Sequence, residues 1–125
     1  MRRFNGVCII TPDVRRLRDF YHAVLQIDAQ GDDAFVAFST SGAALSIFSV
    51  QGMETMAPGS MSGAGTGSYI LEFEVDKVDE EYARLTALGV VVVKPPTTQP
   101  WGRRSVWFRD PDGNIVNFYT NVVVE

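Results

Sequence analysis

The feature of this 125-residue chain that most constrains its fold is an internal repeat. Residues 6–14 align without a gap with residues 70–78, and both segments read as a strand, one charged residue and a valine that begins a helix. In each half, further candidate strands follow the helix, and the last one comes after a polar turn that ends in glycine, at residues 39–42 and 110–113. A repeated order of elements indicates a repeated structural unit, so we expect the order β-α-β-β-β twice.

The first half contains the elements of one such module. Residues 4–11 are rich in β-branched residues, as in a strand. Thr11-Pro12-Asp13 offers a capping side chain, a proline suited to a first turn and an early acid, so a helix is predicted to run to about Leu25. Residues 30–33 read as a turn, and residues 35–38 and 44–50 as two strands. The predicted apolar face of this helix carries Val14, Leu17, Tyr21, Val24 and Leu25, and the polar face carries Arg15, Arg18, Asp19 and His22.

The second half repeats this order. Residues 69–75 read as a strand, and a second helix is predicted from the acidic segment 76–79 to Gly89. Its apolar stripe consists of Val78, Tyr82, Leu85 and Leu88. Residues 90–93 read as a short strand that ends at Lys94-Pro95-Pro96, and the chain closes with a hairpin of strands 105–108 and 115–119.

Two connecting segments differ in character. Asp110-Pro111-Asp112-Gly113-Asn114 is typical of a tight turn, because Pro111 presets one φ angle, Gly113 accepts a positive φ, and the aspartates and Asn114 can bond their own backbone. Residues 51–67 hold five of the eleven glycines and three methionines without a regular period, so we predict a linker or mobile loop there. Methionines lining a ligand are the alternative for this loop.

Length and composition narrow the class of protein. We expect a single domain, residues 1–125, made of two modules at about 1–50 and 68–125. The net charge is −4 and no basic stripe is present, so nucleic acid is not an expected partner. No apolar run is long enough to span a membrane, so no membrane partner is expected either. Cys8 is the only cysteine, which excludes an internal disulfide and is consistent with a cytoplasmic location.

The segment FRDPDGN, preceded by WGRR and followed by an apolar strand, resembles the closing hairpin of the glyoxalase/bleomycin-resistance/extradiol-dioxygenase family, also called the vicinal oxygen chelate superfamily. TPDVRRLRDFYHAVL and EFEVDKVDEEYARLTALGV resemble its two helices, and the βαβββ repeat extends the resemblance over essentially the whole chain. The resemblance implies an α+β fold in which two βαβββ modules form a curved mixed sheet of half-barrels, with helices on the outer face. It also implies a ligand on the opposite face and a homodimer, for which the apolar segment 122–124 is a candidate contact.

Metal-dependent members of this family place four ligands, His or Glu, at matched positions of the two modules. The resemblance carries these positions to Gly6, Ser46, Ile70 and Asn117. Glycine and isoleucine have no side-chain donor, and serine and asparagine are weak neutral ligands. His22, the only histidine, is predicted on the solvent face of the first helix. We therefore expect neither a metal nor another cofactor.

Strand alternation divides the candidate site residues between two faces. Glu72 and Glu74 are expected on the face opposite the helix, either as acid–base groups or, as we favour, at the edge of the cavity where it meets water or a partner chain. Arg103 and Arg104 are neighbours in one strand, so only one can face inward, and the alternation favours Arg103. The predicted ligand-binding residues are Cys8, Phe38, Ser46, Phe48, Trp101, Arg103, Ser105, Trp107, Asn117 and Tyr119. Val36 is predicted beside Phe38 on this face.

Several of these residues have a structural interpretation as well. Cys8 can be a small buried hydrophobe rather than a reactive thiol. Trp101, Trp107 and Tyr119 can fill a core, and an arginine such as Arg103 more commonly forms a surface ion pair than it binds a carboxylate or phosphate. We give ligand stacking on Trp107 the same weight as core packing.

Two functions from different classes fit these observations. The first is a metal-independent small-molecule binding protein that takes a planar or aromatic compound in a groove, as the resemblance to the bleomycin-resistance branch implies. The second is an enzyme, a lyase or isomerase that uses general acid–base chemistry from Glu72 or Glu74. We rank binding first because the sequence contains no set of nucleophile, base and orienting group. Whether the protein is an enzyme stays open, and a small regulatory or structural dimer without a ligand is a third possibility.

Overall fold

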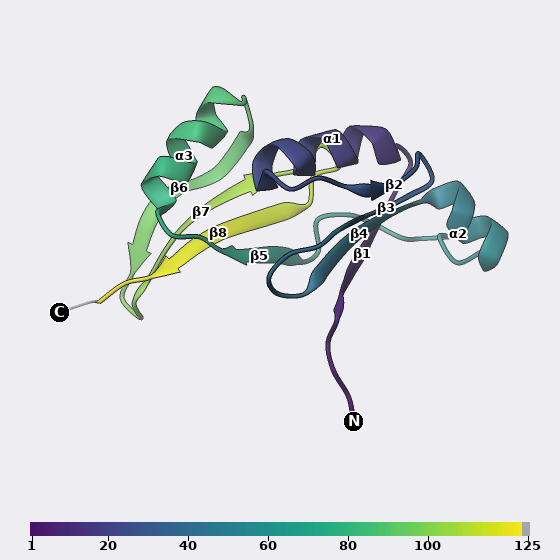
Figure 1. Ribbon diagram of the computed structural model, residues 1–125, viewed down its shortest axis with the longest axis horizontal. Helices are drawn as coiled ribbons and strands as arrows, with labels where there is room; N and C mark the ends of the chain where they lie inside the picture. The colour runs from purple at the N-terminus through teal and green to yellow at the C-terminus, as the bar shows by residue number, and fades with distance from the viewer. Residues whose placement is uncertain (124–125) are drawn as a thin grey trace. The chain divides into compact units, whose positions relative to one another are not determined.

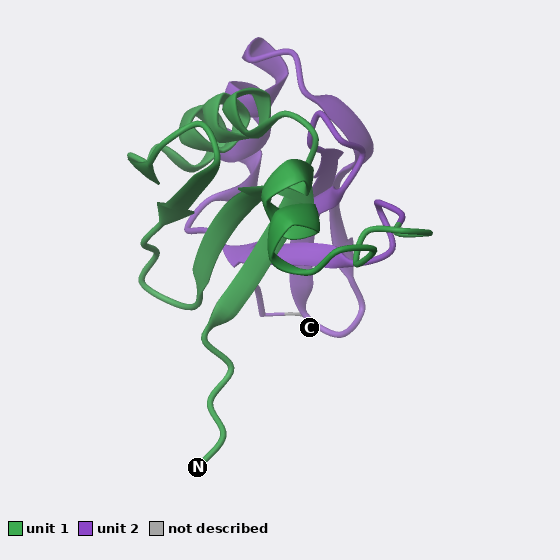
Figure 2. Ribbon diagram, turned by 90° about the vertical axis from the view of Figure 1, so that its right-hand side faces the viewer, with its two compact units in different colours: residues 1–64 green, residues 65–125 purple. Residues whose placement is uncertain are grey.

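The computed structural model describes residues 1–123. It consists of two compact units, Met1–Ala64 and Gly65–Glu125, drawn in green and purple in Figure 2. Each unit contains its own four-stranded mixed sheet, and neither sheet is closed. The order β-α-β-β-β occurs once in each unit, which confirms the repeat predicted from the sequence (Figure 1).

The first unit begins with β1 (Gly6–Thr11) and α1 (Val14–Leu25), and continues with β2 (Gln30–Gly31), β3 (Phe35–Phe38), β4 (Ala44–Ser49) and α2 (Val50–Met56). Its strand order is β1-β4-β3-β2, with β1 parallel to β4 and the other pairs antiparallel. Helix α1 forms over the predicted segment, but its cap is Asp13 rather than Thr11: the Asp13 side chain accepts a hydrogen bond from the backbone nitrogen of Arg16 at 3.1 Å. The buried core of this unit contains Ile9, Val14, Leu17, Tyr21, Val24, Val36, Phe38, Leu45 and Ile47.

The second unit contains β5 (Ile70–Glu74), α3 (Val78–Ala87), β6 (Val91–Gln99), β7 (Arg103–Arg109) and β8 (Ile115–Asn121). Its strand order, β5-β8-β7-β6, repeats that of the first unit, with β5 parallel to β8. Helix α3 packs against β6, β7 and β8. Phe108 and Phe118 meet edge to face in the core between helix and sheet, with ring centroids 5.0 Å apart. The other buried apolar residues of this unit are Leu71, Val78, Leu85, Val106 and Val116.

The turn between β7 and β8 forms as predicted from its sequence. One oxygen of Asp110 accepts hydrogen bonds from the backbone nitrogens of Asp112 and Asn114, both at 2.9 Å, and the other accepts from the Asn114 side chain. Gly113 has a φ of 90°, which an L side chain rarely adopts. The Asn114 Oδ1 atom accepts a further hydrogen bond from the backbone nitrogen of Gly67, so the turn also holds the segment before β5.

The prediction of an irregular loop over residues 51–67 was wrong for its first part, where α2 forms. Ser49 caps this helix by accepting a hydrogen bond from Gly52 N at 2.9 Å. Gly52 lies so close to Phe48 that a Cβ atom there would be 2.5 Å from the ring. Glu54 accepts hydrogen bonds from the backbone nitrogens of Gly59 and Met61, which orders the turns that follow. A short helix fixed by one cap and one close contact leaves no apolar period in the sequence.

Several strand boundaries differ from the prediction. Strand β6 continues through Pro95 and Pro96 instead of ending there, because it is an edge strand, where the missing N–H groups are tolerated. Its pairing with β7 shifts register between Val92 and Lys94 and again between Lys94 and Thr97. Residues 30–31 form β2 rather than a turn, and β1 begins at Gly6 rather than residue 4. None of the helices within residues 1–123 has the length and apolar character needed to cross a membrane.

Candidate functional site

The sheet of the second unit has one face turned away from α3, and most of the predicted site residues lie on it. Residues paired across a strand ladder point to the same face. One paired row runs from Glu72 through Asn117 and Trp107 to Lys94, and a second runs from Glu74 through Tyr119 and Ser105 to Thr97. We call this surface the Trp107 face and define it by Glu72, Glu74, Lys94, Arg103, Ser105, Trp107, Asn117 and Tyr119.

The two adjacent arginines of β7 point to opposite faces, as strand alternation requires. Arg104 donates from Nε and Nη2 to the two carboxylate oxygens of Asp79 on α3, at 2.9 and 2.7 Å. The Arg104 hydrogen bond lowers the pKa of the Asp79 carboxyl. Arg103 instead lies on the Trp107 face, where its guanidinium carbon is 3.8 Å from the centre of the Tyr119 ring.

Glu72 joins three strands of the Trp107 face through one oxygen. Its Oε2 atom accepts hydrogen bonds from Arg103 Nη1 at 3.3 Å and from Asn117 Nδ2 at 3.0 Å. Residues from β5, β7 and β8 are thereby held in a fixed relation, although they are 31 and 45 positions from Glu72 in the chain. This contact fixes the orientation of the Asn117 amide, because an ionised carboxylate only accepts hydrogen bonds.

Both large aromatic side chains of the Trp107 face attract cations. The Lys94 ammonium lies 4.7 Å from the centre of the Trp107 ring, and the planar Arg103 guanidinium stacks on Tyr119. The core of this unit is on the other side of the sheet, where Phe108 and Phe118 are almost fully buried. Trp107 therefore does not fill the core between α3 and the sheet.

Two polar atoms at the centre of the Trp107 face lack hydrogen-bond partners within the described residues: Trp107 Nε1 and Asn117 Oδ1. Both atoms are buried, and the Asn117 residue is only 3% exposed. Leaving a buried donor or acceptor unpaired costs about 1–3 kcal/mol. The face therefore presents one unused donor and one unused acceptor on residues that pair directly across β7 and β8.

The corresponding face of the first unit carries different chemistry. Cys8 pairs with Ser46, which pairs with Ala37, and Cys8 is exposed rather than buried. Phe35 and Phe48 pair in the next row and meet edge to face at 6.0 Å. This surface is thus mostly small and aromatic, without the charged groups of the second unit.

The structure corrects the placement of Phe38 on this surface. Phe38 pairs with Leu45 and is fully buried, as is its predicted companion Val36, so both belong to the core on the α1 side. Their neighbours Phe35 and Ala37 occupy the positions that correspond to Ser105 and Trp107. The prediction was wrong because a shift of one residue along a strand moves every side chain to the opposite face.

The remaining predicted site residues lie at the edges of the arrangement. Trp101 is 75% exposed in the turn between β6 and β7, so it neither fills a core nor belongs to the rows of the Trp107 face. Glu74 is exposed on β5 beside Tyr119. Lys94 is the functional candidate that sequence reasoning missed, since it was read as the end of a strand. Lys94 would have been assigned to this face if the strand had been predicted to continue through the two prolines.

The four positions that hold metal ligands in metal-dependent relatives carry no suitable set here. At Gly6 a Cβ atom would lie 2.2 Å from the carbonyl oxygen of Ala44, so no side chain fits without moving the backbone. Asn117 already donates to Glu72, and Ile70 offers no donor atom. Within residues 1–123, no group of three His, Cys, Asp or Glu side chains is arranged to hold a metal ion. Metal independence rests on this donor chemistry and stays a prediction.

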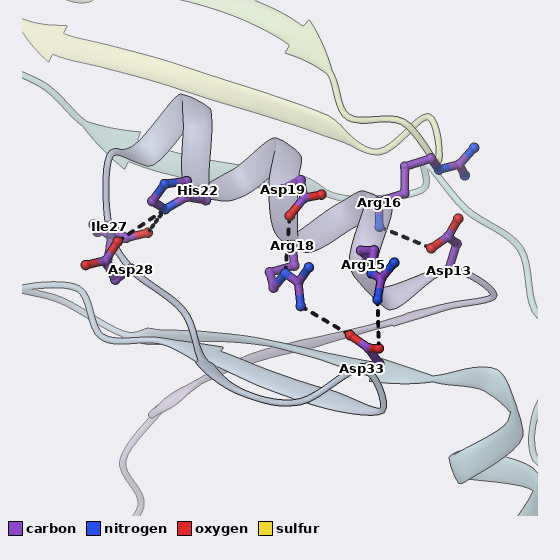
Figure 3. Close-up of polar contacts among 9 residues, drawn as sticks. All are labelled: Asp13, Arg15, Arg16, Arg18, Asp19, His22, Ile27, Asp28 and Asp33. Atoms are coloured by element: carbon purple, nitrogen blue, oxygen red, sulfur yellow. Dashed lines mark hydrogen bonds and ion pairs between the residues drawn. The ribbon is translucent and has the colours of Figure 1, made fainter.

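The polar face of α1 forms a second cluster of charged side chains (Figure 3). Arg15 and Arg18 both reach Asp33, at 3.2 and 3.3 Å, and so fasten the helix to the turn before β3. His22, on the solvent side as predicted, places Nδ1 3.0 Å from the carbonyl oxygen of Ile27 and 3.5 Å from Asp28. These exposed ion pairs each contribute about 0–1 kcal/mol. We assign them a structural role.

Two open hollows lie in the first unit. One, of about 350 Å³, is lined by Arg18, His22, Asp28 and Gly31 among others, with the buried Val36 at its wall. The other, of about 550 Å³, lies between the start of α1 and the start of α2 and includes Val14 and Ser49. Sequence reasoning found neither hollow, because both depend on how a helix end meets a loop.

The fold and the repeat are those of a known family. The model of the Glyoxalase/Bleomycin resistance protein/Dioxygenase superfamily matches residues 3–118. This chain therefore belongs to the glyoxalase/bleomycin-resistance/dioxygenase superfamily, as its sequence resemblance predicted.

Individual relatives share the fold rather than a known activity. The chain is 36% identical over 61 residues to the uncharacterized protein YraH of Bacillus subtilis (strain 168), a match that covers 48% of this chain and 48% of YraH. It thus spans about half the length of this curated relative. The crystal structure of a glyoxalase/bleomycin resistance protein/dioxygenase family enzyme from Burkholderia phytofirmans PsJN is similar over 97% of this chain and 100% of its own, with a TM-score of 0.86 and 20% identity. A protein of unknown function from Agrobacterium tumefaciens str. C58 has a TM-score of 0.80 and 28% identity, over 98% and 96% of the two chains.

Proposed function

We propose that this protein is a metal-independent small-molecule binding protein that takes a planar or aromatic compound on the Trp107 face. The observation that carries the proposal is the position of Trp107, a large indole ring on the sheet face that the core does not use. Membership of a superfamily whose members bind small molecules supports it. The donor-poor set of Gly6, Ser46, Ile70 and Asn117 supports binding without a metal.

Stacking on the indole is the main expected contribution to affinity. An aromatic ring on Trp107 gains about 0.5–1.5 kcal/mol beyond the burial of apolar area. Lys94 occupies part of this space, and its flexible side chain moves aside or contacts the edge of the ligand. Arg103 stays fixed by Glu72 and Tyr119, so it forms a wall of the site rather than a free cation.

The matching experiment is a fluorescence titration with a panel of aromatic compounds. We expect ligand-dependent quenching in the wild type, and quenching that persists in Trp101→Phe comes from Trp107, which is then the only indole. Trp107→Ala should weaken binding about tenfold or more, counting stacking and lost area together. Trp107→Phe should lose less. The proposal fails if Trp107→Ala mainly lowers the melting temperature and no compound in the panel quenches the wild type.

Metal independence has its own measurement. Purified protein should contain less than one equivalent of zinc, nickel, iron or manganese after gentle dialysis, and binding should be unchanged by a chelator. One tightly held equivalent, coordinated by residues of the two sheets, would contradict the proposal.

One observation favours a second candidate function, that of a lyase or isomerase. The carboxylate of Glu72 lies in the same row as Asn117 and Trp107, within reach of a compound bound there. In that case Glu72→Gln would abolish turnover of a bound compound while its affinity stayed within a few fold. Glu74 is the alternative acid–base group, and Glu74→Gln is the corresponding variant.

A further inference from the structure

Stacking alone leaves the two unpaired atoms at the centre of the Trp107 face without partners. More than nine in ten buried polar groups in proteins are hydrogen-bonded. Trp107 Nε1 and Asn117 Oδ1 are both buried and unpaired within residues 1–123, and their residues pair directly across neighbouring strands. Two such exceptions side by side indicate a recognition element for a group that is both acceptor and donor.

The roles of the two atoms are fixed by chemistry. The indole nitrogen only donates a hydrogen bond. The amide of Asn117 is oriented by Glu72, because its Nδ2 donates to the Glu72 carboxylate at 3.0 Å and the exchanged orientation would bring two acceptors together. Arg103 holds Glu72 in turn at 3.3 Å. The chain Arg103–Glu72–Asn117 therefore leaves Oδ1, an acceptor, free on the residue that pairs with Trp107, which offers the donor.

The complement of this pair is a ligand whose acceptor and donor are bonded to the same carbon atom. A carbonyl next to an N–H supplies both, with the carbonyl oxygen toward Trp107 and the N–H toward Asn117. A carboxylate supplies no donor, and it would face the oxygens of both Asn117 and Glu72. A ketone satisfies Trp107 but leaves the Asn117 oxygen unpaired.

We propose that the Trp107 face selects planar compounds that carry an amide-type group, such as a lactam, an imide or a primary aromatic amide. This inference rests on the proposed function, because it assigns the ligand class of the same site. Trp107 then acts twice, through its ring face in stacking and through its N–H in recognition. Glu72 and Arg103 are positioning residues that act through Asn117.

The test compares three probes of the same ring: naphthalene-2-carboxamide, 2-acetylnaphthalene and naphthalene-2-carboxylate. Binding to the intact chain is measured by isothermal titration calorimetry. We expect the amide to bind at least about tenfold more tightly than the ketone and the carboxylate. The reason is that only the amide donates a hydrogen bond to the Asn117 oxygen, which otherwise stays buried without a partner.

Variants separate recognition from folding. Glu72→Gln allows the Asn117 amide to rotate and present Nδ2 instead of Oδ1, so the preference for the amide over the ketone should fall toward one, with the ketone gaining affinity. Asn117→Leu should give the same loss of preference. Circular dichroism and the melting temperature show whether the Asn117→Leu protein, which is changed at a buried residue, still folds. If it does not fold, the test relies on Glu72→Gln, because Glu72 is exposed. Glu80→Gln on α3 is the matched control. It removes a carboxylate whose described ion pair is with Lys77, away from the Trp107 face, and this variant should keep the full preference for the amide.

The outcomes distinguish this inference from the function on which it rests. A wild-type preference that Glu72→Gln removes supports it. Equal binding of the amide and the ketone, both with quenching of Trp107, overturns it and leaves the proposed function standing, with a bound water between the two atoms as the explanation. Failure of all three probes and of a wider aromatic panel overturns both.

Discussion

The two sheets of this protein share one strand order, and three of their four strands pair in the same register, yet their open faces differ. In each unit the side that faces the helix is apolar and buried, and the other side carries three matched residues in a row across adjacent strands. The matched rows are Cys8, Ser46 and Ala37 in the first unit, and Glu72, Asn117 and Trp107 in the second. The helix-facing sides agree because each unit needs a core. The open faces are free of that requirement. Among the residues that the structure describes, only the face of the second unit combines charged groups, an indole ring and buried polar atoms without partners.

The largest loss of stability should come from a substitution on the buried, helix-facing side of a sheet, which is the side that the two units have in common. Phe118→Ala removes a ring that is almost fully buried against Phe108, so the free energy of unfolding should fall by about 3–5 kcal/mol. Tyr119→Ala, one residue further on the open face, should cost about 1 kcal/mol. Urea unfolding measures both. Equal losses would mean that the open face is also core.

A smaller effect should separate the first residues of the two matched strands, Gly6 and Ile70. Gly6→Ala should lower the free energy of unfolding by about 1–3 kcal/mol, because its Cβ would overlap the Ala44 carbonyl. Ile70→Ala, at a residue that is 40% exposed, should lower it by about 1 kcal/mol. A stable Gly6→Ala protein would show that the two strand starts are equivalent after all.

A still smaller effect should come from the stacked pair that only the second unit has. Arg103→Gln and Tyr119→Leu, combined in a double-mutant cycle, should show a coupling of about 0.5–1 kcal/mol. Chemical unfolding at low and high salt measures it. If the two effects simply add, the stacked geometry contributes nothing to stability.

The smallest effect concerns the contact between sheet and helix in the second unit. Arg104 donates to Asp79 and holds the pKa of that carboxyl below its ordinary value of about 3.9. A carboxyl whose pKa is lowered by folding stabilises the fold at any pH above the pKa that it has in the unfolded chain. This contribution is lost as the pH falls through the pKa of the folded state. Asp79→Asn should therefore lower the melting temperature slightly at pH 7 and hardly at all near pH 2. A difference that grew toward low pH would contradict this sign.

Much of the fold could be predicted because its signals are local. The apolar stripe of α1 and the Asp110–Asn114 turn each depend on residues a few positions apart, and each formed as expected. Helix α2 could not be found in this way, since its stability depends on the Ser49 cap and on the contact of Gly52 with Phe48. Strand β6 passes through its prolines only because no strand pairs with its outer edge.

The site was less predictable than the fold. Alternation and the family resemblance together placed Trp107, Asn117 and Tyr119 on one face, because successive side chains of an extended strand point to opposite faces whatever the sequence. The same reasoning misplaced Phe38, because β3 has four residues and no internal marker of its register. The absence of a hydrogen-bond partner for Asn117 Oδ1 among the described residues could not be predicted from the sequence. It depends on the contact with Glu72, which only the paired strands bring close.

The prolines of β6 also bear on how copies of this chain can associate. An exposed sheet edge is a template for another strand, and such templates lead to fibres as readily as to dimers. Pro95 and Pro96 both lack an amide donor, and because adjacent N–H groups of a strand point to opposite sides, one of the two is missing from the outer edge. The two register shifts around Lys94 interrupt the regular repeat of this edge. These features make β6 a poor template for strand addition. If the homodimer predicted from the family resemblance forms through a sheet edge, we expect it at an edge other than β6, and we expect no fibre growth from β6.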